Sequence, residues 1–119
     1  MRHMVVENVT RSYLLAGCAE VADTFLHRFR GLMGRRSLAA GEGLILNPTN
    51  AVHSFGMRFS IDVIHADRQG TVLRLLSDLA PNRIGPIVRQ GRITIELPAG
   101  TIARSGTKVG DTIRLSSPS

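Results

Sequence analysis

The sequence predicts a single α+β domain, in which a mainly antiparallel sheet forms a small β-barrel or a strongly curled sheet with one packed amphipathic helix. About seven short apolar runs alternate with turn residues at the spacing of a meander or small barrel. One segment, residues 24–33, instead carries apolar residues at helical spacing. The 119 residues, 43% hydrophobic and 20% charged, are ordinary for one soluble domain. We therefore expect one domain over residues 1–119.

The N-terminal third is predicted to supply two strands and the helix. Residues 4–6 are expected to begin a short strand or to belong to a tail. Residues 13–21 are expected to form a strand in which Cys18 is a buried free thiol. Asp23 and Thr24 give a helix N-cap signal, and the helix over residues 24–33 is expected to pack on the sheet. Its apolar face is predicted to comprise Phe25, Phe29, Leu32 and Met33, with His27, Arg28 and Arg30 facing solvent.

The rest of the chain is predicted to consist of strands joined by turns. Strands are expected at residues 44–46, 52–55, 59–66, 71–76, 92–97 and 113–115, with one helical turn at residues 101–105. The strand over residues 59–66 has the strongest signal, because Ile61, Val63 and Ile64 are β-branched. In the alternating segment 92–97, one side carries Ile93, Ile95 and Leu97, and the other carries Thr94 and Glu96.

Several blocks of this sequence resemble a known family. VADTFLHRFRGLMGR, GEGLIL, VHSFGMRFSIDVIHAD, LAPNRIGP and ITIELPAGT, with a terminal VGD, are similar in order to the small prokaryotic proteins called domain of unknown function 192. The resemblance covers roughly residues 13–115. It implies a compact, barrel-like β-rich fold with one main helix and no established activity. Thr49 and Asn82 stand where a subgroup of that family often has Cys and Trp, so a site built on that thiol or indole is not expected here.

The central stretch, residues 43–65, is the expected site, because polar groups interrupt its dense apolar sequence. A ligand-binding cleft is predicted to be bordered by His53, Met57, Arg58, Asp62 and Arg83. A buried carboxylate needs hydrogen bonds or a partner. Asp62 is therefore expected either to accept backbone N–H groups or an arginine, or to line the cleft. Arg35, Arg83 and Arg89 are the candidate arginines.

The sequence contains no complete catalytic set. We therefore expect an uncharacterised, non-enzymatic accessory domain that binds a small ligand or a partner. The alternative is a small hydrolase using Asp62 and His53 as acid/base groups, which requires the two side chains to lie within hydrogen-bond reach of each other or of one water. No metal or cofactor is expected, because catalytic zinc usually needs three protein ligands and no suitable His spacing occurs.

The strong positive charge sets the expected partners. The net charge is +6, and 14 of the 15 basic residues are arginine. Four arginines lie at and after the end of the helix: Arg28, Arg30, Arg35 and Arg36. They are expected either to form a solvated face that complements the helix dipole or to form an anion patch. The expected partner is an anionic small molecule or an acidic protein. A nucleic-acid-binding domain is a further alternative that charge allows, but base stacking needs exposed aromatics, and the chain has no Trp and one Tyr.

Targeting signals are weak. The sequence has no apolar run of the roughly 20 residues that a membrane-spanning helix needs. The box Leu15-Ala16-Gly17-Cys18 matches a lipoprotein cleavage site, but it lacks the preceding apolar segment. We therefore take a cytoplasmic location as the default expectation.

Overall fold

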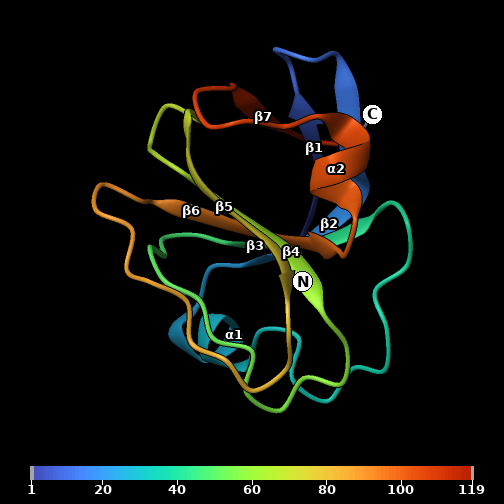
Figure 1. Ribbon diagram of the computed structural model, residues 1–119, viewed down its shortest axis with the longest axis vertical. Helices are drawn as coiled ribbons and strands as arrows, with labels where there is room; N and C mark the ends of the chain where they lie inside the picture. Colours follow the sequence, from blue (N-terminus) through green and yellow to red (C-terminus); the bar gives the residue numbers. More distant parts are fainter. Residues whose placement is uncertain (1, 119) are drawn as a thin grey trace.

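The computed structural model describes residues 2–118, apart from the side chain of Phe25. Within these residues, seven strands form one sheet in the order β5-β4-β6-β3-β2-β1-β7, which curls into a half-barrel (Figure 1). The strands are β1 (His3–Asn8), β2 (Tyr13–Ala22), β3 (Glu42–Leu46), β4 (Ile61–Ala66), β5 (Val72–Leu79), β6 (Ile93–Pro98) and β7 (Ile113–Ser116). Two short helices, α1 (Phe25–Arg30) and α2 (Thr101–Ser105), lie at opposite ends of this sheet in Figure 1.

The sheet is mixed rather than purely antiparallel. β2 and β3 run parallel, with Cys18 opposite Glu42 and Ala22 opposite Leu46, whereas the other neighbouring pairs are antiparallel. A parallel pair needs a crossover connection, and the segment that contains α1 supplies it. The fold is therefore mostly β with one parallel pair and two short helices, and it departs in these details from the predicted sheet with one helix.

The two outer strands of the sheet meet at one end. Thr71, just before β5, forms a bridge with Thr112, just before β7. The amide of Ile113 donates to the carbonyl of Gly70 at 2.8 Å. Gly70 has a φ of 91°, and a Cβ there would collide with the carbonyl oxygen of Ile113, so this close approach requires glycine. The closure pairs backbone groups that a free sheet edge would expose.

Apolar side chains fill both faces of the central strands. The inner cluster, beneath α2, contains Val6, Leu15, Ala16, Ala19, Val21, Ile45, Ile64, Val72, Ile95, Leu97, Ile102 and Ile113. The outer cluster, on the α1 side, contains Ala22, Leu32, Leu38, Leu44, Leu46, Val52, Met57, Ile61 and Val63. β4 is buried along its whole length, and its residues are apolar except for Asp62 and His65. No helix among the described residues has the length and apolar content to cross a membrane.

The structure corrects three local expectations. α1 ends at Arg30, because Gly31 turns the chain with a φ of 51°. Phe29 is consequently 60% exposed, although Leu32 is buried as expected. Cys18 is also exposed, because it lies on the solvent side of β2. Residues 52–55 form no strand, and the β-pairing described for them is an isolated bridge between His53 and Ile84.

Other expectations are confirmed. Thr24 caps α1, because its hydroxyl oxygen accepts the amide of His27 at 3.2 Å. The helical turn at residues 101–105 is present as α2. The alternation of β6 is also present, but α1 and the nearby loops cover its second face. Thr94 and Glu96 are therefore buried rather than solvated.

Candidate functional site

Two long loops pair with each other on the outer face of the sheet. They follow β3 and β5 and run beside α1 (Figure 1). Ser54 joins them: its hydroxyl donates to the carbonyl of Ala80 at 2.6 Å and accepts the amide of Arg83 at 2.9 Å. The amide of Gly85 donates to the carbonyl of Val52. A Cβ at Gly85 would lie only 2.8 Å from Val52 Cγ1, so the loops approach this closely because residue 85 has no side chain.

The paired loops and α1 enclose an apolar hollow with a volume of about 360 Å³. We define the apolar hollow by its lining residues, which are Phe29, Met33, Ala51, Val52, His53, Phe55 and Ile84. Phe29, Phe55 and Ile84 are 60%, 44% and 72% exposed, which is unusual for large apolar side chains gathered at one place. The volume lies near the lower end of the roughly 300–1,000 Å³ typical of small-molecule sites.

His53 forms part of the wall and ties the loop to α1. Its Nε2 lies 3.0 Å from the carbonyl oxygen of Phe29, and its Nδ1 accepts the amide of Phe55 at 3.3 Å. These partners assign a neutral imidazole with the proton on Nε2, since a carbonyl only accepts and an amide only donates. The ring stacks on Phe55 at 5.5 Å and lies tilted against Phe29 at 5.8 Å. His53 therefore holds both aromatic walls of the apolar hollow in place.

A second, polar hollow of about 290 Å³ lies where α1 meets β2. We define the polar hollow by Glu20, His27, Arg30, Gly31, Met33 and Arg35. The guanidinium of Arg35 lies 3.9 Å from a carboxylate oxygen of Glu20 and 3.6 Å from one of Glu42, both loose ion pairs. Arg30 is exposed. Met33 lines both hollows, so the two are adjacent.

Two buried ionisable groups lie on the same outer face. Glu96 is 2% exposed, and its Oε1 has no hydrogen-bond partner. Burial raises the pKa of Glu96 to about 8, so the carboxyl is uncharged at neutral pH. His65 is fully buried; its Nδ1 lies 2.9 Å from the hydroxyl of Thr94, and its Nε2 has no partner. Burial, with a smaller contribution from the charge of Arg74, lowers the pKa of His65 to about 4.

Asp62, in contrast, belongs to the inner face and is fully bonded. Its carboxylate accepts the amides of Asp78 at 2.9 Å, Gly100 at 3.1 Å and Ile102 at 2.8 Å. The structure therefore supports the expectation that Asp62 accepts hydrogen bonds from backbone N–H groups. All three of these donors are amides, and none is an arginine. Asp62 anchors the start of α2, whereas His53 contacts α1, so their hydrogen bonds do not bring the proposed acid/base pair together.

The other residues of the predicted cleft are dispersed. Met57 is 6% exposed and belongs to the outer core cluster. The side chains of Arg58 and Arg83 are exposed, and neither residue lines the two hollows. The predicted anion patch is partly assembled. Arg30 and Arg35 line the polar hollow, whereas Arg28 donates to the carbonyl of Asp23 and Arg36 points to solvent.

Sequence reasoning did not identify the apolar hollow. Phe55 and Ile84 line it, yet each is a single apolar residue between polar and glycine neighbours, with no periodic pattern that would place it. The expected burial of Phe29 is wrong, and Gly31 is the signal against it, because this residue ends the helix before the full apolar stripe can form. Glu96 was assigned to one side of an alternating strand, and nothing local indicates that this side is covered.

Among residues 2–118, no group of three or more His, Cys, Asp or Glu side chains is arranged to hold a metal ion. The structure is thus that of a small half-barrel with adjoining apolar and polar hollows beside its first helix. The chain belongs to the DUF192 family, described as an uncharacterized ACR, whose family model matches residues 6–115. This confirms the resemblance seen in the sequence and extends it toward the N-terminus.

Relatives and solved structures agree with this assignment. An archaeal UPF0127 protein from Thermococcus sibiricus is 33% identical over 110 residues, which cover 89% of this chain and 71% of the relative. A crystal structure of a protein of unknown function from Novosphingobium aromaticivorans superimposes with a TM-score of 0.81 at 23% identity, covering 94% of this chain and 83% of that one. A second structure, from Sinorhizobium meliloti, has the same TM-score and identity and covers 95% and 92% of the two chains; its description suggests transcription regulation. At this identity the two structures establish a shared fold.

Proposed function

We propose that this protein is a non-enzymatic binding domain whose ligand places an apolar group in the apolar hollow. The observation that carries this proposal is the gathering of Phe29, Phe55 and Ile84, all substantially exposed, around a cavity of ligand size. Exposing large apolar side chains together costs free energy in water, and a ligand that covers them recovers part of it.

The hydrogen bonds of the candidate acid/base residues favour binding over hydrolysis. Both ring nitrogens of His53 are engaged with backbone groups of Phe29 and Phe55. The carboxylate of Asp62 is engaged with three amides on the other face of the sheet. A general base needs a free lone pair within reach of the proton that it abstracts, and neither side chain offers one toward the apolar hollow. His53 serves the proposed site as a rigid wall.

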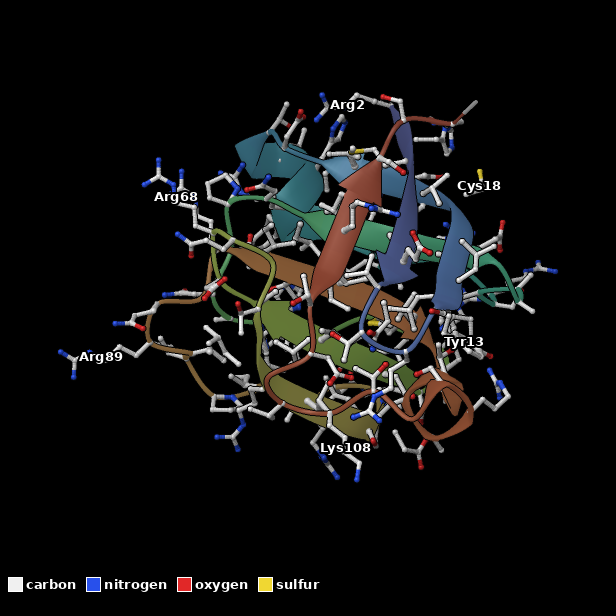
Figure 2. All side chains as sticks on the ribbon, turned by 90° about the horizontal axis from the view of Figure 1, so that it is seen from above. Arg2, Tyr13, Cys18, Arg68, Arg89 and Lys108 are labelled. Carbon is white, nitrogen blue, oxygen red and sulfur yellow. The ribbon has the colours of Figure 1, made fainter. Side chains whose placement is uncertain are left out.

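The positive charge supports a small anionic ligand better than a nucleic acid. Figure 2 shows Arg2 at the top of the molecule, Arg68 and Arg89 on the left and Lys108 at the bottom, so these four cations do not gather in one place. A nucleic-acid site gathers its cations along one groove or face. The description of the Sinorhizobium structure raises the regulatory alternative for that protein. In this chain, the dispersed cations attract anions in general, and the two hollows provide the specific binding site.

The test is a titration of the ¹⁵N-labelled protein with 1-octanol, an uncharged apolar probe. We expect amide shifts that cluster at Phe55 and Ile84 and saturate. Ile84→Ser removes part of the wall and should weaken binding about tenfold, because roughly 1–2 kcal/mol of apolar contact is lost. The matched control is Ile87→Ser, since Ile87 is 77% exposed but does not line the hollow.

Two results would contradict the proposal. Shifts scattered over the surface, or equal effects of Ile84→Ser and Ile87→Ser, would mean that octanol binds without using the apolar hollow. Turnover of a simple ester that disappears in His53→Ala would instead restore the hydrolase alternative.

A further inference from the structure

The two hollows lie on either side of one side chain, Met33. The apolar hollow takes Phe29 and Met33 from the α1 segment, and the polar hollow takes Arg30, Gly31 and Met33 from the same segment. Met33 is half-buried, and its side chain packs close to Gly56, where a Cβ would lie 3.3 Å from the terminal methyl group. An unbranched thioether adapts easily to a neighbour. One ligand can therefore occupy both hollows by lying across Met33.

The polar hollow contains one guanidinium, that of Arg30, which no acidic side chain pairs with among the described residues. Arg30 and Arg35 supply two positive charges, and Arg35 shares its charge with Glu20 and Glu42 at 3.9 and 3.6 Å. The formal charges of these four side chains sum to zero. Arg30 is the cation that has no acidic partner among the described ion pairs. A doubly charged phosphate would need more positive charge than this, whereas a carboxylate needs one guanidinium and a hydrogen-bond donor.

A buried carboxyl lies directly behind the polar hollow. A Cβ at Gly31 would come within 4.0 Å of Oε1 of Glu96, so this lining residue places no side chain between Glu96 and the hollow. Oε1 is buried and has no partner. Such an atom in a native protein calls for a specific explanation, since nearly all buried polar atoms are bonded. Glu96 carries its proton at neutral pH, because burial raises its pKa to about 8. It therefore places no negative charge behind the polar hollow that would repel an anion.

We propose that the ligand is a short amphipathic monocarboxylate, whose carboxylate lies in the polar hollow against Arg30 and Arg35 while its apolar chain crosses Met33 into the apolar hollow. This inference rests on the proposed binding function and specifies the chemical class of the ligand. The polar end determines which apolar molecules are accepted, and the apolar end supplies most of the contact area.

Three probes separate the two hollows in amide titrations of the full chain. Octanoate carries both ends of the proposed ligand, 1-octanol has the chain without the charge, and acetate has the charge without the chain. We expect octanoate to shift the amides of Phe55 and Ile84 together with those of Gly31 and Arg35. Octanol should shift only the amides of Phe55 and Ile84. It should bind about tenfold more weakly than octanoate, because it lacks one charge-assisted contact. Acetate should shift only the second pair, at high concentration.

Substitution of one arginine tests the carboxylate contact. Arg30→Gln should weaken octanoate about tenfold and leave octanol unchanged, because only the charged ligand uses the guanidinium. The control is Arg36→Gln, which removes the same charge from an exposed residue outside both hollows. Equal losses in the two variants would reduce the effect to general attraction and overturn the inference.

The outcomes also distinguish this inference from the proposed function. Equal affinity for octanol and octanoate, with no shift at Gly31 or Arg35, overturns the carboxylate subsite and leaves the apolar binding function intact. Shifts by acetate at Gly31 and Arg35 without any octanol shift at Phe55 and Ile84 overturn the binding function while supporting the anion subsite.

Discussion

The two faces of the sheet treat buried polar groups in opposite ways. On the inner face, Asp62 gives its carboxylate to three backbone amides and anchors α2. On the outer face, Glu96 and His65 each bury an atom without a partner, beneath α1 and the paired loops. The inner face is arranged for stability, because its polar groups are satisfied. The outer face retains costly groups beside two open hollows, which is the pattern expected where function is favoured over stability.

The largest expected effect lies on the inner face. Asp62→Ala removes the acceptor of three amides, and unsatisfied buried N–H groups cost about 1–3 kcal/mol each, so we expect a loss of roughly 3–5 kcal/mol in the free energy of unfolding. Urea denaturation measures it. The control is Asp67→Ala, since Asp67 also accepts two amides but in a half-buried turn, where water replaces the lost acceptor. Equal losses in both variants would show that the inner face is no more demanding than a surface turn.

Removing the carboxyl from the outer face should have the opposite sign. The folded pKa of Glu96, about 8, lies above its ordinary value of 4.5. Its contribution to stability is therefore fully present below pH 4.5, falls as the pH rises, and levels off above pH 8. Glu96→Met does not titrate, so its stability relative to the parent should rise by roughly 3–5 kcal/mol between pH 4.5 and 8.

A second variant at the same position separates charge from shape. Glu96→Gln keeps the size of the side chain and also removes the titration. Unfolding free energies of both variants, measured from pH 4.5 to 8.5, should therefore rise relative to the parent in parallel, with a constant offset between them. Curves that run parallel to that of the parent would mean that Glu96 ionises normally, and the contrast between the two faces would lose its main support.

These contrasts explain which parts of the structure local sequence can predict. The hairpin at Asp67–Gly70, the turn of α2 and the apolar run of β4 follow from residues that are neighbours in the chain. The parallel pairing of β2 with β3 and the exposure of Cys18 depend on which strands become neighbours. No pattern within a single strand predicts its neighbours. His53 was recognised as notable from its polar character in an apolar stretch.

The two hollows could not be predicted from the sequence for the same reason. Ile84 meets His53 only because two loops about thirty positions apart in the sequence pair through Ser54. The burial of Glu96 arises because α1 and the loops cover a face of β6 that alternation alone leaves open to solvent. A polar residue in an alternating strand is exposed or buried according to what covers it, and the covering segments lie far away in sequence.

The smallest of the three stability effects concerns His65, and it sharpens the comparison from the acid side. The folded pKa of His65, about 4, lies below its ordinary value of 6.5. The unfolded chain therefore takes up a proton as the pH falls below 6.5, while the folded protein does not until about pH 4. The contribution of His65 to the free energy of unfolding is therefore fully present above pH 6.5 and is lost as the pH falls toward 4. His65→Asn keeps a group able to reach the hydroxyl of Thr94 but does not titrate.

Between pH 6.5 and 4, we expect His65→Asn to gain roughly 2–4 kcal/mol relative to the parent, whatever constant cost the smaller side chain imposes. Thermal or urea unfolding at several pH values measures this change. The slope is opposite in sign to that of Glu96, so the double variant with Glu96→Gln should lose both slopes and depend less on pH than either single variant. Curves for His65→Asn and the parent that run parallel between pH 6.5 and 4 would mean that the folded protein protonates His65 as readily as the unfolded chain does, and the contrast between the two faces would then rest on Glu96 alone.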